Sequence, residues 1–142
     1  TFYDGDWYLT DELREAVRTK QPFTDEMRDR YYAIIVRRLT ELRHGDRFLV
    51  FGQATFKERH RQQILAAHPD TIFVLITAEL SLRMDRLLRG HNPVTADYAR
   101  TIDQFFEPPQ HPFFTIHNSG TRSDVARQCL ELLGELARTG KM

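Results

Sequence analysis

Four short runs of almost continuously apolar residues constrain the fold of this chain most strongly. They are residues 1–4, 47–52 (RFLVFG), 71–77 (TIFVLIT) and 113–117 (FFTIH). None of the runs alternates regularly between apolar and polar residues, a pattern typical of strands whose two faces are both covered in a parallel sheet. We therefore predict four strands of a parallel sheet that is packed between helices.

Patterns typical of helices separate the four runs. The expected helices run from the cap Thr24 to Gly45, over 56–67, from the cap Thr77 to Gly90, from the cap Thr95 to Pro108, and onward from the cap Thr121. Strand and helix thus alternate along the whole chain, without an internal repeat or a linker. This order predicts a single α/β domain over residues 1–142 with right-handed crossovers.

The charges of the chain cancel, with 20 basic and 20 acidic residues among 142. This balance gives no reason to expect non-specific binding to nucleic acid or to a membrane. The single cysteine, Cys129, excludes an internal disulfide and a cysteine-based zinc site, and no apolar run approaches the length that spans a bilayer. We therefore expect a cytoplasmic protein without nucleic acid or a membrane as a partner, and the sequence leaves a homodimer open.

Polar residues follow three of the expected strands at their carboxyl ends, where ligands bind in parallel sheets. After the first strand, Asp4 and Asp6 can hold the water shell of a Mg²⁺ ion and orient a hydroxyl, and an ordinary turn is the equal alternative. Lys57 lies near a helix start that can receive an anion, although a solvated lysine is the favoured alternative. The turn at 118–121 can bind the edge of a base or simply connect two elements.

Arginines supply two further candidate sites. Arg83, Arg86 and Arg89 are spaced by three residues, so they share a helix face and can converge on one anion. A solvated helix face is the favoured alternative. The expected helix after Thr24 carries four more arginines that can contact RNA phosphates, although acidic residues are interspersed with them: Arg30, Arg37, Arg38 and Arg43.

Five stretches together resemble the P-loop small-molecule kinases, most closely the gluconate kinase family, with shikimate kinases as a neighbouring family. They are FYDGDWYLT (2–10), PFTDEMRDRYY (22–32), ATFKERHRQQIL (54–65), IFVLITAELSLRMDRLLRGHNP (72–93) and DQFFEPP (103–109). The resemblance implies a three-layer α/β fold with a parallel sheet flanked by helices. It also implies ATP and Mg²⁺ as cofactors, and phosphoryl transfer to a hydroxyl of a small metabolite, such as the sugar acid gluconate.

The same resemblance implies roles for individual residues. Asp4 would lie near the metal and its waters, and Asp6 would contact the accepting hydroxyl. Arg28 and Lys57 would bind the substrate. Arg86 and Arg89 would be catalytic lid arginines over the ATP phosphates, within a lid over about 86–95. The turn that would cradle adenine consists of Asn118, Ser119, Gly120 and Thr121.

This sequence departs from the family pattern at several positions. Leu9 and Leu13 replace a His and an Asn that look substrate-facing in gluconate kinases, and Glu58 replaces a second base. The two lid arginines are one residue closer together than is usual. The P-loop motif Gly-x-x-x-x-Gly-Lys-Ser/Thr does not occur in the 142 residues.

In this fold the P-loop follows the central first strand of the sheet. We therefore expect about forty further residues before Thr1, comprising that strand, the loop and one helix. Two alternatives to a kinase remain open at this point. One is a catalytically inactive protein of the kinase fold that binds a nucleotide or a partner, and the other is an RNA-binding module that uses the arginine-rich helix.

Overall fold

The computed structural model of the chain describes residues 1–45, 48–90 and 94–141. Its internal contacts divide the chain into two compact units. The first comprises Thr1–Thr71 and Asn92–Pro109, and the second comprises Ile72–His91 and Gln110–Met142. No helix in the described segments is long and apolar enough to cross a bilayer.

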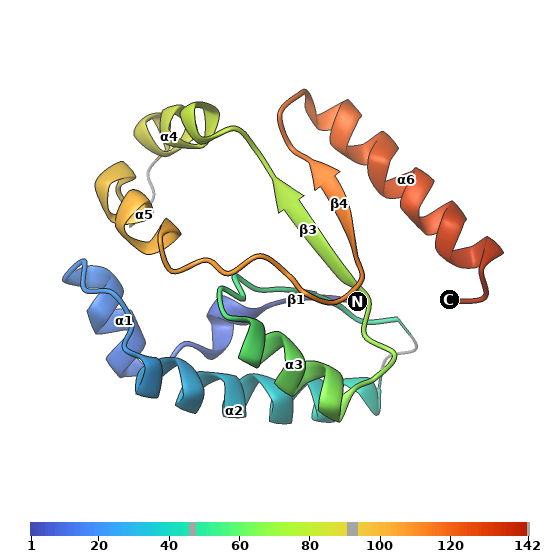
Figure 1. The fold of residues 1–142 in the computed structure, drawn as a ribbon, viewed down its shortest axis with the longest axis horizontal. Coiled ribbons are helices and arrows are strands. Elements are labelled where there is room, and N and C mark those ends of the chain that lie inside the picture. The colour runs from blue at the N-terminus through green and yellow to red at the C-terminus, as the bar shows by residue number, and fades with distance from the viewer. Residues whose placement is uncertain (46–47, 91–93, 142) are drawn as a thin grey trace. The chain divides into compact units, whose positions relative to one another are not determined.

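The first unit contains one small parallel sheet and most of the helices (Figure 1). Strand β1 pairs in parallel with β2, with Phe2 opposite Val50 and Asp4 opposite Gly52. The elements of this unit are β1 (Phe2–Asp4), the 3₁₀ helix η1 (Gly5–Tyr8), α1 (Asp11–Arg18), α2 (Asp25–Arg43), β2 (Val50–Gly52), α3 (Glu58–Ala67) and α5 (Ala96–Asp103).

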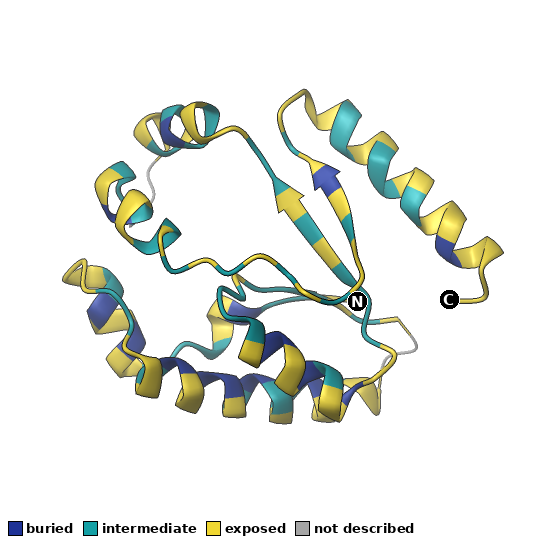
Figure 2. Cartoon of the chain, viewed as in Figure 1, coloured by how far each residue is buried: buried dark blue, intermediate teal, exposed yellow. Residues whose placement is uncertain are grey.

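Helix α2 provides the central packing surface of this unit. Thr24 begins the helix as its cap, because its hydroxyl accepts a hydrogen bond from the Met27 N–H. The buried side chains of α2 include Tyr31 and Ile35, which are separated by about one turn. In Figure 2 the buried parts of α2 lie on the side toward α3, a helix that contacts α2 and whose Ile64 is also buried. This packing fixes α2 beneath the segments that follow β1 and β2.

The second unit contains the other pair of strands. Strand β3 (Phe73–Thr77) pairs in parallel with β4 (Phe113–His117), residue by residue along both strands. Helix α4 (Leu80–Arg89) follows β3, and α6 (Arg122–Arg138) packs against β4. Thr121 caps α6 through a reciprocal capping box with Asp124, as its sequence pattern indicates.

The parallel pairing of the strands is confirmed, but the described strands form two sheets of two strands each. Helices were expected to cover both faces of each strand, and in the described structure they do so only in part. Helix α6 packs against β4 and buries Ile116, whereas Ile76, the partner of Ile116 on β3, remains 64% exposed. Val50 on β2 is 60% exposed. The three-layer arrangement is therefore confirmed only in part.

The expected boundaries of two helices were wrong. Thr77 does not cap α4, because it remains in strand β3, where its hydroxyl lies 2.9 Å from Nδ1 of His117. The cap residue of α4 is Glu79. Helix α5 begins after Thr95, as expected, but it ends at Asp103 instead of reaching Pro108. The ring of Phe105 lies over the Arg28 guanidinium, a tertiary contact that the helical periodicity could not reveal.

Helix α1 was not anticipated from the sequence. The Thr10 hydroxyl accepts a hydrogen bond from the Leu13 N–H and so caps the helix. Leu13 and Ala16, three residues apart, are its buried residues. The cap and this spacing were the available signals, but only eight residues carry them. So short a pattern forms a stable helix only when Leu13 and Ala16 pack against the rest of the unit.

Candidate active site

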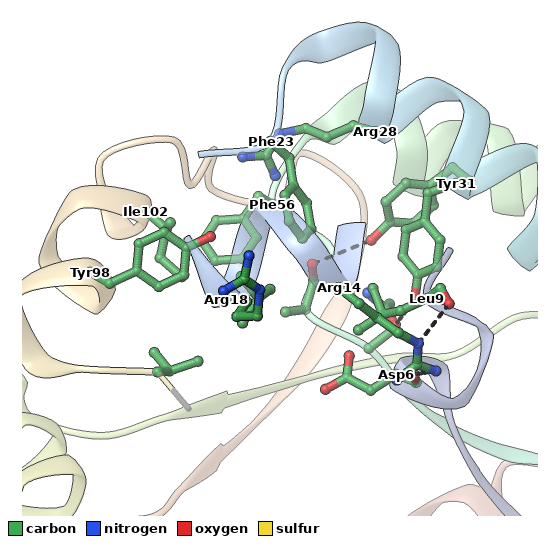
Figure 3. Close-up of a pocket in the computed structure, with 15 residues that line it drawn as sticks. Asp6, Leu9, Arg14, Arg18, Phe23, Arg28, Tyr31, Phe56, Tyr98 and Ile102 are labelled. Atoms are coloured by element: carbon green, nitrogen blue, oxygen red, sulfur yellow. Dashed lines mark hydrogen bonds between the residues drawn. The ribbon is translucent and has the colours of Figure 1, made fainter. Parts of the chain in front are cut away.

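A cavity of about 540 Å³ lies within the first unit, which is a size that suits a small-molecule ligand (Figure 3). Five parts of the unit supply its lining. They contribute Asp6 from η1, Arg14 from α1, Arg28 from α2, Ala54 from the segment after β2, and Tyr98 from α5. The cavity therefore contains two of the three residues that were expected to bind the substrate.

Asp6 is positioned by its immediate neighbours. Its N–H donates a 3.0 Å hydrogen bond to the Asp4 carboxylate, which caps η1. The Asp6 carboxylate itself makes no hydrogen bond or ion pair within the described part of the chain. Partial burial and the neighbouring Asp4 charge raise the pKa of Asp6, and the positive charge of Arg14 opposes them. A carboxylate in this state can accept a hydrogen bond, and then a proton, from a bound hydroxyl.

Gly5 joins this segment to helix α2. Its carbonyl accepts a 2.8 Å hydrogen bond from the Tyr31 hydroxyl, whose oxygen also lies 3.0 Å from Oε1 of Gln53. A Cβ at Gly5 would overlap the side-chain amide of Gln53, so a larger residue here would require this flexible side chain to move. The backbone before Asp6 is therefore held by helix α2 through Tyr31.

Arg28 is a buried cation without an ion pair in the described structure, although the negative charge of Asp25 acts on it from a greater distance. Its exposed fraction is 7%, and its guanidinium lies 5.5–5.6 Å from the ring centroids of Phe23, Phe56 and Phe105. Among residues 1–45, 48–90 and 94–141 it has no hydrogen bond or ion pair. Burial lowers the pKa of Arg28 from its ordinary value. A buried guanidinium with free donors that lines a cavity is suited to bind a carboxylate or a phosphate.

Most of the remaining lining is apolar or already hydrogen-bonded. The Tyr98 hydroxyl donates to the Gln21 carbonyl, and the Tyr32 hydroxyl donates to the Ala54 carbonyl. Burial raises the pKa of Tyr32 to about 12, so this hydroxyl stays protonated near neutral pH. The apolar side chains of the lining are Leu9, Val17, Phe23, Phe56, Val94 and Ile102.

The two leucines that replace family residues have different positions. Leu9 lines the cavity, whereas Leu13 is a core residue with an exposed fraction of 1%. Sequence reasoning did not identify Arg14 or Tyr98 as lining residues. Arg14 belongs to the unanticipated helix α1, and Tyr98 has the spacing of an ordinary core residue of α5, so neither position carried a functional signal.

Lys57 lies outside the cavity lining and is paired with Glu107. The ammonium of Lys57 lies 3.0 Å from Oε1 of Glu107, while Oε2 of Glu107 accepts a 2.8 Å hydrogen bond from the Glu58 N–H at the start of α3. These two partners lower the pKa of Glu107. The predicted role of Lys57 in substrate binding stays a prediction.

Asp4 and Asp6 provide the oxygen donors that were expected near Mg²⁺. Within the described segments, no group of three His, Cys, Asp or Glu residues is arranged to hold a metal ion. Magnesium usually keeps several of its waters and needs only one or two protein carboxylates. The two aspartates therefore fit a magnesium ion that is held largely through water.

The other predicted residues belong to the second unit. Nη1 of Arg86 donates a 2.8 Å hydrogen bond to the Asn118 carbonyl, and the Asn118 N–H donates to the Thr77 carbonyl at 2.7 Å. Arg86 is thus brought to the 118–121 turn, whose Thr121 caps α6. Arg89 is instead 79% exposed and paired with Asp85. Residues 91–93 of the expected lid lie outside the described residues.

The arginines that were considered for RNA binding lie in ion pairs with acidic side chains. The pairs are Arg30 with Glu12, Arg37 and Arg38 with Glu41, and Arg43 with Asp70. Each arginine already has an anionic partner, which leaves α2 without an uncompensated stripe of positive charge. No structural observation favours the RNA-binding alternative.

Comparison with known proteins identifies the fold. A scan against models of protein families finds no match, and a search of curated proteins finds none either. Among solved structures, a gluconokinase from Sinorhizobium meliloti 1021 matches with a TM-score of 0.81 and 21% identity, over 97% of this chain and 79% of that chain. An unliganded sugar kinase from Janibacter sp. HTCC2649 matches with a TM-score of 0.78 and 15% identity, over 94% and 79%. The chain therefore has the fold of these two kinases.

Proposed function

We propose that the protein transfers a phosphoryl group from ATP to a hydroxyl of a small carboxylated metabolite. The observation that carries this proposal is the state of two charged groups in one cavity. The Asp6 carboxylate and the Arg28 guanidinium both line it, and neither makes a hydrogen bond or an ion pair among the residues that the structure describes, although Arg14 and Asp25 act on them electrostatically from a greater distance. The sugar-kinase fold neighbours make a sugar acid, such as gluconate, the reference acceptor with which other hydroxy acids are compared.

Arg28 and Asp6 would bind different parts of the acceptor. Arg28 binds the carboxylate of the acceptor through a charge-assisted hydrogen bond, which is strong because the guanidinium itself is buried. Asp6 accepts the hydrogen bond of the reacting hydroxyl and takes its proton as the new P–O bond forms, while the bond from the γ-phosphorus to the β,γ-bridging oxygen of ATP would break and ADP would leave. Tyr31, through Gly5, keeps the backbone before Asp6 in place.

The nucleotide functions are proposed for the second unit. Bound ATP would supply the γ-phosphoryl group, and Mg²⁺ near Asp4 would offset the charge on its oxygens. The turn at Asn118–Thr121 would bind adenine, and Arg86 and Arg89 would neutralise phosphate charge. The proposal includes the P-loop strand and loop expected from the resemblance, so the full-length natural protein is the form to assay.

An assay of ADP release tests the proposal. The full-length protein is incubated with ATP, Mg²⁺ and a panel of hydroxy acids that includes gluconate. The variant Asp6→Asn should lower kcat by about 100-fold or more, because general-base catalysis typically contributes this much. Asp70→Asn removes an exposed carboxylate outside the cavity and should leave kcat within about twofold. Equal ADP release by Asp6→Asn and the unmodified protein would exclude the proposed role of Asp6.

A further inference from the structure

We propose that the acceptor is a hydroxy acid with one carboxylate, one reacting hydroxyl and an otherwise apolar body, rather than a polyhydroxylated sugar acid. This inference rests on the proposed function, because it treats the cavity of the first unit as the acceptor site. It goes further by assigning the chemical class of the molecule that fills that cavity.

The first step of the argument concerns the polar groups of the cavity. The Tyr31, Tyr32 and Tyr98 hydroxyls all donate to protein carbonyl oxygens. Of the four charged lining residues, Arg14 donates to the Leu9 and Asp6 carbonyls, and Arg18 pairs with Glu15. Asp6 and Arg28 are the two whose charged groups have no partner in the described structure. Gln53 also lines the cavity, and its Oε1 lies 3.0 Å from the Tyr31 hydroxyl oxygen. Among its charged groups, the cavity thus offers one unpaired anion, suited to a hydroxyl, and one unpaired buried cation, suited to a carboxylate.

The second step concerns the walls. In the view of Figure 3, Tyr98 and Ile102 lie across from Asp6 and Leu9, and Phe23 and Phe56 lie between these two sides. These side chains, apart from the carboxylate of Asp6 and the engaged Tyr98 hydroxyl, present carbon atoms.

The third step is the cost of filling such a space with a polyol. A hydroxyl that leaves water for an apolar wall loses its hydrogen bonds and gains none. A six-carbon sugar acid would bring four hydroxyls besides the reacting one, and the free charged groups are already assigned to the carboxylate and the reacting hydroxyl. The apolar body of a simple hydroxy acid gains affinity from the same walls through the hydrophobic effect.

Two acids with the same carbon chain test the inference. Gluconate carries five hydroxyls, and 6-hydroxyhexanoate carries only the terminal one. In calorimetry without nucleotide, we expect 6-hydroxyhexanoate to bind the full-length protein at least about tenfold more tightly than gluconate. Each gluconate hydroxyl that finds no hydrogen-bond partner in the cavity weakens binding. Hexanoate and 6-hydroxyhexanamide should both bind more weakly than 6-hydroxyhexanoate, because each lacks one of the two recognised groups. Gluconate that binds as tightly as 6-hydroxyhexanoate, or the absence of binding by both acids, overturns the inference.

A variant at the wall provides a second measurement. Leu9→His places a hydrogen-bonding group in the lining and should narrow the ratio of the two affinities to about threefold or less. Leu130→His makes the same change at a 70% exposed position of α6 and should leave the ratio unchanged. An unchanged ratio in Leu9→His overturns the assignment of selectivity to this wall.

The two proposals fail in different ways. Binding of 6-hydroxyhexanoate without ADP release from any acid would contradict the kinase function and support the acceptor class. Tighter binding and phosphorylation of gluconate would support the kinase function and overturn the acceptor class.

Discussion

The hydroxyl of Tyr31 donates a hydrogen bond of 2.8 Å to the carbonyl of Gly5, the residue directly before Asp6. Tyr31 is 2% exposed and belongs to α2, the longest helix of the first unit. Through this bond the helix holds the segment that follows β1. The position of the Asp6 carboxylate is thus set by a contact between residues 26 positions apart in the chain.

Removing this hydroxyl should destabilise the fold. We expect Tyr31→Phe to lower the free energy of unfolding by about 1–3 kcal/mol, because the buried Gly5 carbonyl loses its donor. Urea unfolding measures the change. Tyr8→Phe is the matched control, since the Tyr8 hydroxyl has no hydrogen bond in the part of the chain described, and it should shift the value by less than about 0.5 kcal/mol. Equal losses in both variants would contradict the anchoring role of Tyr31.

Substitution of Arg28 should weaken ligand binding without lowering the stability of the fold. Arg28→Met removes an unpaired buried cation, so we expect the free energy of unfolding to stay the same or to rise. Affinity for 6-hydroxyhexanoate should fall at least about tenfold, because the carboxylate loses its charged partner. Arg30→Met breaks the exposed pair with Glu12 and should leave binding unchanged. A loss of more than about 2 kcal/mol of stability in Arg28→Met would show that the guanidinium stabilises the fold and would contradict its assignment as a ligand-binding group.

The pH dependence of stability should have opposite signs at two aspartates. Burial and Asp4 raise the pKa of Asp6 above its ordinary value of 3.8, so the folded state binds this proton more tightly than the unfolded state does. The stability that Asp6 contributes therefore falls as the pH rises from 3.8 through the raised pKa of the folded state. Asp6→Asn should be more stable than the unmodified protein at pH 7, and the difference should vanish below pH 3.8.

Asp29 provides the comparison of opposite sign. Hydrogen bonds from His60 and Arg59 lower the pKa of Asp29 below 3.8, so its contribution is present above that pH and is lost as the pH falls through the lowered pKa. Asp29→Asn should therefore be less stable than the unmodified protein at pH 7, with a difference that shrinks in acid. Urea unfolding of both variants between pH 7 and acid pH measures how each difference in the free energy of unfolding depends on pH. Parallel trends would contradict the assigned causes of the shifts.

The contact between Glu107 and the start of α3 should stabilise the first unit. Glu107→Gln weakens the pair with Lys57, and we expect it to lower the free energy of unfolding by about 1 kcal/mol or less, since the carboxylate is partly exposed. Glu131→Gln breaks an exposed pair with Arg127 within α6 and should cost less, about 0.3–0.5 kcal/mol. Thermal unfolding of the two variants compares them. A larger loss in Glu131→Gln would contradict the role of Glu107.

Local patterns predicted the elements that carry their own signals. Thr24, Thr95 and Thr121 begin helices where the sequence placed caps, since each hydroxyl bonds to a backbone N–H three residues later. Thr77 carries the same signal but remains in β3, because strand pairing with His117 holds it extended. Helix α1 was missed because its eight residues are stabilised by packing of Leu13 and Ala16, which a short pattern does not reveal.

The sequence by itself determined the alternation of strands and helices, the parallel pairing and the candidate Asp6, because these depend on local spacing and residue type, and its resemblance to gluconate kinases added the candidate Arg28. Only the tertiary structure decided which candidate groups remain available to a ligand. Lys57 is paired with Glu107, 50 residues away, whereas Arg28 is enclosed by aromatic rings and makes no ion pair in the described chain. The physical reason is that burial and pairing of a charge depend on residues distant in the chain, which come together only when it folds.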